Sequence, residues 1–93
     1  MKQTKNPAKV AAALGHLDAD GLCTSVVKVS QGGRSWHVNS VGQGERGWWM
    51  RLSHPDFPQS RCDAIDVGQV FHVYTQAQYA RMLEVLRKEE ENV

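Results

Sequence analysis

The chain has 93 residues, of which 41% are hydrophobic and 23% are charged, and its formal net charge is +1. This length suits one domain, residues 1–93, and this composition is typical of a globular protein and not of a disordered one. A net charge so close to zero excludes a strong overall attraction to nucleic acid or to anionic membranes.

The first predicted element is a helix over residues 8–17, which follows a polar segment, residues 1–5, that we expect to fray. Asn6 followed by Pro7 is a typical helix start, with asparagine as the N-cap and proline at the first helical position. A helix this short is marginal alone, so it should dock on another element. Its apolar residues recur at helical spacing: Val10, Leu14 and Leu17.

Beyond the helix, the apolar period changes from helical to alternating, which predicts an antiparallel sheet of three to five strands. Glycine and proline clusters mark the turns between the strands, at 31–33, 42–47 and 54–58. The segment 60–67 is ambiguous between an edge strand and an irregular crossing. We expect the other strands over residues 23–30, 34–41, 48–53 and 67–74.

The C-terminal helix has the strongest local pattern. Thr75 followed by Gln78 matches a capping box, which predicts a helix from residue 76 to about residue 88. Residues 89–93 should fray, because the negative charges of Glu89, Glu90 and Glu91 are unfavourable at the C-terminal end of a helix. The predicted fold is therefore α+β, in the order α-β-β-β-(β)-β-α. We expect these residues to be buried together: Trp36, Val38, Trp48, Met50, Leu52, Phe71, Val73, Met82, Leu83 and Leu86.

The sequence carries no motif of a known enzyme class. Gly42, Gly44 and Gly47 match a dinucleotide-binding spacing, but they lie between two predicted strands with no helix after them, so we interpret them as a flexible turn. The cysteines and histidines lack metal-ligand spacing, and we expect no cofactor or metal. An alternative is a small enzyme that depends on Cys62, because Arg61 beside it would lower the pKa of its thiol and His54 or His72 would supply a base.

The outward side chains of the predicted hairpin are the most informative candidate site. Alternation places Trp49 and Arg51 on the face opposite Trp48, and an outward tryptophan beside cations suits either a protein interface or a stacked nucleobase. A third interpretation is that a helix covers Trp49 and makes it part of the core. The predicted partner-binding residues are Lys28, His37, Asn39, Arg46, Trp49 and Arg51, and His54, Phe57 and Arg61 would extend this surface.

These observations favour a non-enzymatic protein that docks on a larger macromolecule, most naturally a protein, as an inhibitor or adaptor. Small domains without a catalytic motif are typical of phages and mobile elements. The alternative is a module that binds single-stranded nucleic acid through Lys28, Trp49 and Arg51. A homodimer is compatible with the sequence. With two isolated cysteines and no targeting or membrane segment, we expect a cytoplasmic location and no membrane partner.

Overall fold

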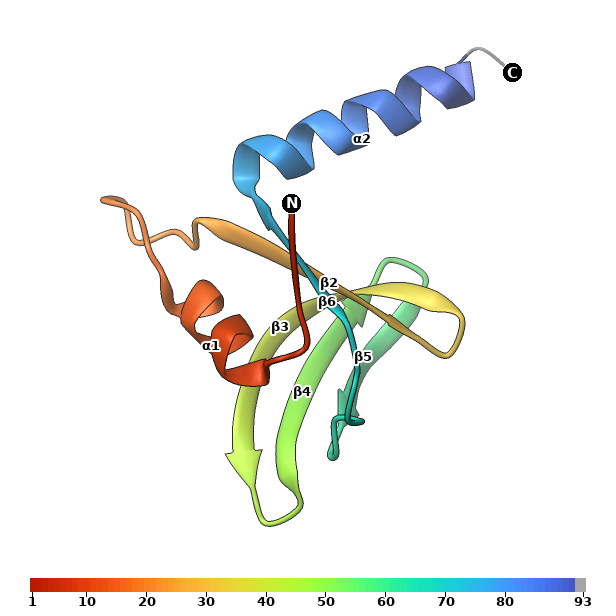
Figure 1. Cartoon of the computed structure of the whole chain (residues 1–93). Helices are drawn as coiled ribbons and strands as arrows, with labels where there is room; N and C mark the ends of the chain where they lie inside the picture. Colours follow the sequence, from red (N-terminus) through yellow and green to blue (C-terminus); the bar gives the residue numbers. More distant parts are fainter. Residues whose placement is uncertain (92–93) are drawn as a thin grey trace.

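A computed structural model describes residues 1–91, and these form a six-stranded antiparallel sheet with a helix near each end (Figure 1). The strand order is β1-β6-β2-β3-β4-β5, so that β2 to β5 form a meander and β6 returns to pair with β2. The α+β class is confirmed, but the sheet has one strand more than the upper limit expected. In chain order the elements are β1 (Lys2–Thr4), α1 (Pro7–Gly15), β2 (Ser25–Gln31), β3 (Arg34–Gly44), β4 (Gly47–His54), β5 (Phe57–Cys62), β6 (Phe71–Thr75) and α2 (Gln76–Glu91).

The additional strand is β1, in the segment that the sequence predicted to fray. Lys2 pairs with Val73 and Thr4 with Phe71, so the strand covers an edge of β6 that would otherwise expose its backbone groups. Three polar residues are too short for an alternating pattern. Their pairing is therefore decided by the free edge of β6 and not by their own composition.

Helix α1 begins where the sequence predicts and ends two residues earlier than expected. The Asn6 side chain accepts a hydrogen bond from the Ala8 amide at 3.0 Å, and Pro7 lies at the start of the helix. At the other end His16 is extended, and Leu17 forms an isolated antiparallel bridge with Cys23. That bridge draws the chain away from the helix axis and leaves Leu17 exposed.

The β3–β4 hairpin is longer than predicted, because the glycines at 42 and 44 lie within β3 instead of in a turn. The turn itself is short, and Gly47 has the positive φ, +100°, that favours glycine. A bulge at Asn39 interrupts the register, since Val38 pairs with Leu52 while Ser40 pairs with Arg51.

The later strands also differ from expectation at their ends. β5 begins at Phe57, within the predicted loop, and its last residue is Cys62, so the ambiguous segment is in part an edge strand. β6 begins only at Phe71, because Gly68 has a φ of +91° and Val67 is fully exposed in the preceding turn.

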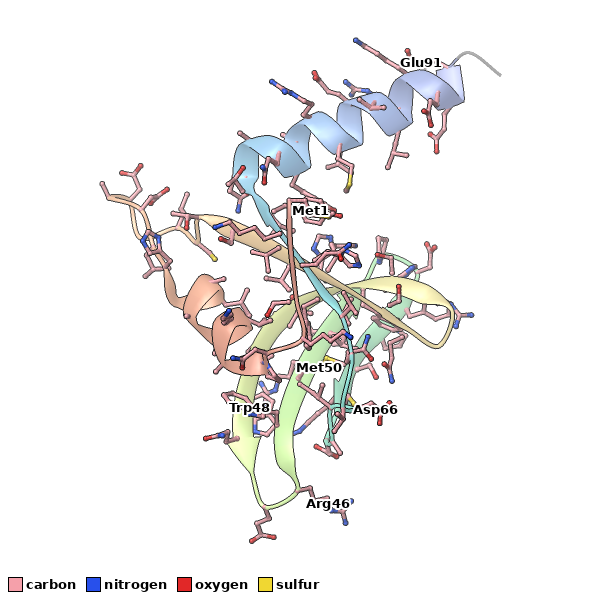
Figure 2. The ribbon with its side chains drawn as sticks, in the orientation of Figure 1. Met1, Arg46, Trp48, Met50, Asp66 and Glu91 are labelled. Atoms are coloured by element: carbon pink, nitrogen blue, oxygen red, sulfur yellow. The ribbon has the colours of Figure 1, made fainter. Side chains whose placement is uncertain are left out.

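The core lies between α1 and one face of the sheet. Val10 is completely buried there, and Leu14 packs beside it. Of the predicted core residues, Val73 packs against this core while partly buried, and Trp48 is half-buried on β4, below α1 in the view of Figure 2. The fully or nearly fully buried set is Val10, Val27, Val29, Trp36, Val38, Met50, Leu52 and Phe71.

Helix α2 does not complete this core, and the prediction that Met82, Leu83 and Leu86 are buried there is wrong. Leu83 and Leu86 are 48% and 49% exposed, and Met82 is half-buried. The helix follows β6 without a connecting loop, so it cannot fold back over the sheet, and α1 already covers the core face. Figure 1 shows α2 projecting from the top of the sheet. The capping box is confirmed, with Thr75 and Gln78 bonded reciprocally at 2.9 and 3.1 Å, but the helix continues through Glu91 instead of ending near Lys88.

Candidate partner-binding surface

The sheet face opposite α1, here called the outer face, carries a continuous row of polar side chains. The register aligns Gln3 with His72, His72 with Lys28, Lys28 with His37, and His37 with Ser53, so the row crosses five strands. Alternation within each strand places this row away from the buried core.

None of the six described strands contains an aspartate or a glutamate. The acidic side chains of residues 1–91 all lie in loops, turns and α2. The side chains of the strands, on both faces of the sheet, are therefore positive or neutral, although the whole chain has a net charge of only +1. The strand cations are Lys2, Lys28, Arg34, Arg51 and Arg61.

In the middle of the outer face, the first turn of α2 touches the polar row. The Tyr79 hydroxyl and Nε2 of His37 are 3.0 Å apart, and the Tyr79 ring packs edge-on to His37 and tilted against Tyr74. Burial lowers the pKa of His37, and the charge of Lys28 lowers it further. Burial likewise lowers the pKa of Lys28 and raises the pKa of Tyr79. Burial thus disfavours the charged forms of His37 and Tyr79, and the contact between them anchors α2.

At the far end of the hairpin, Trp49 lies flat against the backbone of Gly42. A Cβ atom added at Gly42 would approach the Trp49 ring to 2.3 Å, and one added at Gly44 would approach it to 3.4 Å. The glycines that resemble a dinucleotide-binding motif thus provide a seat for an aromatic ring, and Gly47 makes the turn. This contact confirms that the glycine spacing belongs to the hairpin.

Trp49 in turn holds two arginines. The guanidinium carbon of Arg61 lies 4.7 Å from the centroid of the Trp49 ring, and that of Arg51 lies 5.9 Å away. Both distances fall within the range of cation–π attraction. The Arg61 Nε also donates to Asp63 at 2.6 Å, which fixes the orientation of the guanidinium. We call Arg46, Trp49, Arg51 and Arg61 the arginine–tryptophan cluster.

The structure divides the predicted site residues into two groups. His37 contacts the first turn of α2, and Lys28 pairs with His37 from the neighbouring strand. Trp49, Arg51 and Arg46 lie at the hairpin end. There Arg46, Trp49 and Arg61 line a shallow hollow together with the acidic residues Glu45 and Asp63. Asn39 is the bulged residue between the groups and accepts a hydrogen bond from Ser53 at 3.1 Å. Helix α2 contacts β6 and β2 and leaves the cluster uncovered, so the interpretation of Trp49 as helix-covered core is wrong.

Sequence reasoning missed the contribution of His72, Gln3 and Tyr79 to the outer face. Tyr79 has the helical spacing of a core residue, and its contact with His37 depends on the direction in which α2 leaves the sheet. Gln3 belongs to the strand that the sequence did not reveal. The only available signal was strand alternation, which places His72 on the same face of its strand as Tyr74.

The groups weighed for a Cys62 enzyme are not brought together. Cys62 pairs with Met50 on the core side of the sheet, and its thiol donates to the Ala64 carbonyl. Of the two candidate bases, His72 lies on the outer face, and His54 packs against Trp36 and Phe57 and accepts a hydrogen bond from the Asp56 amide. Both cysteines are free thiols. Within residues 1–91 no three His, Cys, Asp or Glu side chains converge as metal ligands.

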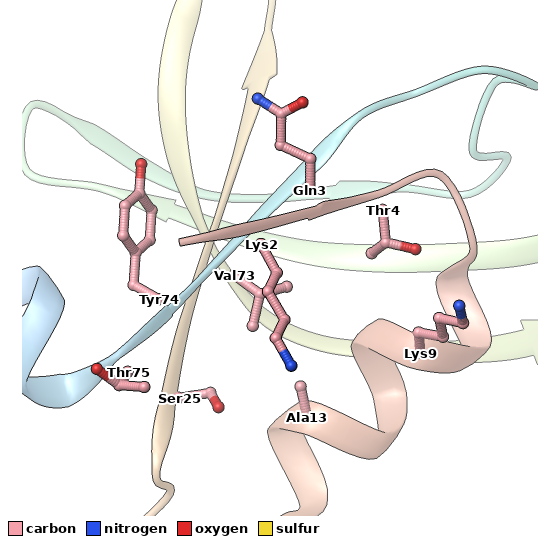
Figure 3. A pocket seen from close by; sticks show the side chains of 9 residues that line it. All are labelled: Lys2, Gln3, Thr4, Lys9, Ala13, Ser25, Val73, Tyr74 and Thr75. Atoms are coloured by element: carbon pink, nitrogen blue, oxygen red, sulfur yellow. The ribbon is translucent and has the colours of Figure 1, made fainter.

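A separate hollow of about 430 Å³ lies between α1 and the β1–β6 edge (Figure 3). Lys2 and Lys9 reach it from the strand and the helix, and Ser25 and Thr75 contribute hydroxyl groups. Figure 3 shows the Lys2 side chain directed toward Ala13 of α1. This hollow lies beside α1, which covers the face opposite the outer face, and it shares no residue with the arginine–tryptophan cluster.

Comparison with protein-family models, with curated proteins and with solved structures finds no match to this chain. Neither helix in residues 1–91 is long and apolar enough to cross a bilayer.

Proposed function

We propose that this chain is a non-enzymatic binding protein, an inhibitor or adaptor, that docks on an acidic surface of a larger protein through the arginine–tryptophan cluster. The observation that carries the proposal is the absence of acidic residues from every described strand, together with the uncovered Trp49 that holds Arg51 and Arg61 in place. Tryptophan and arginine are the residues most often found as energetic centres of protein interfaces.

The arrangement of the cluster reduces the entropic cost of binding. Arg61 is held by the Trp49 ring and by Asp63, so its guanidinium is already oriented before a partner arrives. An arginine held in this way can donate two parallel hydrogen bonds to a carboxylate, and little side-chain freedom is lost when the contact forms.

A protein partner fits this surface better than single-stranded nucleic acid. Stacking of bases needs a free aromatic face, and Trp49 has Gly42 against it on one side and Arg61 over its ring. A nucleic-acid strand also needs cations along its path, whereas the next cation of the outer face, Lys28, lies two strands away from Arg51, beside the His37 that contacts α2. The cluster is thus a compact spot and not a track.

The test uses the full chain immobilised as bait in a lysate treated with nuclease. We expect a specific protein to be retained by the wild type and released as the salt concentration rises, because the contact is between opposite charges. Arg61→Ala and Trp49→Ala should each weaken its retention by at least about tenfold, the loss typical of an interface centre. Two results together would instead indicate the nucleic-acid alternative. The chain would bind purified oligonucleotides with a steep salt dependence, and it would retain no protein from the nuclease-treated lysate.

A second pair of variants separates the position of Trp49 from its chemistry. Gly42→Ala removes no charge and no aromatic ring, but its new methyl group occupies the seat of Trp49. It should lower the affinity nearly as much as Trp49→Ala does. The matched control is Gly15→Ala, because a Cβ atom there meets nothing within 4 Å. Equal binding by the Gly42→Ala and Gly15→Ala variants would contradict the proposed role of the cluster.

A further inference from the structure

Helix α2 leaves a row of apolar side chains without a partner. Of the residues in this helix none is buried, and Leu83, Val85 and Leu86 are 48%, 51% and 49% exposed. Met82, Val85 and Leu86 line a shallow groove along the helix. We call Met82, Leu83, Val85 and Leu86 the apolar stripe.

The body of the protein holds α2 only at its beginning. The helix contacts β6 and β2, and Tyr79 in its first turn also reaches Tyr74 on β6 and His37 on β3. Beyond Tyr79 the helix projects from the sheet (Figure 1). The part of the helix beyond Tyr79, residues 80–91, is of a length that is marginal in water without tertiary packing, so it needs a surface to cover its stripe.

The spacing of the stripe suits a second helix. Tyr79, Met82 and Leu86 are separated by three and then four residues, which is the repeat of a two-helix seam. Leu83 and Val85 flank this seam on its two sides. In an antiparallel pair of α2 helices, Met82 of one copy lies level with Leu86 of the other, and the twofold axis crosses the seam at the level of residue 84.

The charges select the antiparallel arrangement and a second copy as the occupant. Glu89, Glu90 and Glu91 lie at the negative end of the α2 dipole, where they are unfavourable. In the antiparallel pair they lie level with the first turn of the other helix, which is the positive end of its dipole. That turn is anchored above Lys28 and His37, on a sheet whose strands contain no acidic residue.

We propose that the chain forms a twofold homodimer in which the apolar stripes of two α2 helices pack antiparallel and the acidic last turn of each helix faces the basic outer face of the other copy. This inference goes beyond the proposed function, because it uses α2 and not the arginine–tryptophan cluster. The dimer would present two clusters to a partner.

The first experiment measures molar mass across a concentration series by sedimentation equilibrium. We expect a dimer whose dissociation constant rises at least about tenfold in the Leu86→Asp variant, because the new carboxylate would be buried in the seam. Ala80→Asp is the matched control, since it introduces the same charge on the opposite side of the same helix. A monomer at all concentrations up to about 1 mM, or a dimer equally affected by both variants, would overturn the proposal.

The second experiment tests the direction of the helices and the role of charge. In a background with both cysteines changed to serine, spin labels are placed by Arg87→Cys or by Gln76→Cys, two positions on the same side of the helix. The antiparallel pair puts the labels at 76 about 24 Å apart along the axis and those at 87 only about 9 Å apart along it. Equal distances at both positions mean a parallel pair and would overturn the inference.

The charge contribution is tested by replacing Glu89, Glu90 and Glu91 together with glutamine. We expect weaker dimerisation in this variant and a smaller effect of added salt than in the wild type. The pKa of His37, followed by NMR, should rise on dimerisation of the wild type and not in the glutamine variant. Unchanged dimerisation by the glutamine variant would overturn the placement of the acidic turn.

Discussion

The two helices of this protein reverse the usual relation between length and attachment. Helix α1 has only nine residues but buries Val10 completely, and Leu14 packs beside it. Helix α2 has 16 residues and a stronger sequence pattern, yet it buries no side chain. Amphipathic spacing therefore shows that a helix has an apolar side, while the direction in which the chain enters the helix decides what that side can reach.

The strongest test of this difference between α1 and α2 is to replace one valine by alanine in each helix. Val10→Ala should lower the free energy of unfolding by about 2 kcal/mol, because it leaves a cavity under α1. Val85→Ala should change it by less than about 0.5 kcal/mol, because the residue is half-exposed and alanine favours helix. Chemical denaturation in dilute solution measures both. Equal losses in the two variants would show that α2 docks on the sheet after all.

The attachment of α2 itself should depend on pH. The pKa of His37 is below its ordinary value in the folded protein, so the unfolded chain binds the proton more readily. The stabilisation from neutral His37 is thus complete above about pH 6.5 and is lost progressively as the pH falls below that value. Amide hydrogen exchange in the first turn of α2 should quicken over this range, corrected for the intrinsic pH dependence of exchange.

Tyr79→Phe provides the reference for that measurement. It removes the hydroxyl that contacts His37 and should cost about 0.5–1.5 kcal/mol while keeping the ring contacts. In this variant the acceleration at low pH should be smaller. Exchange in α1 serves as the internal control, and acceleration there by the same factor would mean that the whole fold loosens and that the anchor is not the cause.

The smallest effect that we expect is on the pKa of His37, and it separates the two causes that lower this pKa. Lys28 lies directly across from His37 on the neighbouring strand, and its charge is the second cause of the lowered pKa after burial. Lys28→Met keeps the aliphatic side chain and removes the charge, so the pKa of His37 should rise toward its ordinary value. NMR titration of the His37 ring measures this change, and an unchanged or lower pKa would assign the whole shift to burial.

The sequence predicted the parts of the fold that local chemistry determines. Asn6 and Thr75 start helices because their side chains satisfy free backbone amides, and both caps are present. The alternation of Met50 and Leu52 also identified their buried side correctly. Strand β1 and the path of α2 were not predictable in this way, because each depends on an edge or a junction built from distant residues.

The candidate site was predictable in outline for the same reason. The parity of β4 places Trp49 and Arg51 together, and the structure adds Arg61 from the neighbouring strand. The sequence did not show that Gly42 lies beneath Trp49, since that contact depends on the register of the hairpin across the bulge. The sequence also did not show that Lys28 and His37 lie apart from the cluster. That separation depends on the contact of Tyr79 with His37, which the sequence does not reveal.

The bulge at Asn39 fixes which side of the hairpin each distal residue occupies. Because one extra residue stands between Val38 and Ser40, Val41 returns to the side of Met50 and Gly42 comes to lie under Trp49. If Asn39 instead took the place of Ser40 opposite Arg51 in regular alternation, the distal half of β3 would turn over, with Gly42 directed to the core and Val41 to solvent. Removal of Asn39 itself would straighten the strand and leave Val41 and Gly42 on their present sides, so the bulge is needed only because the chain has this one additional residue before Ser40.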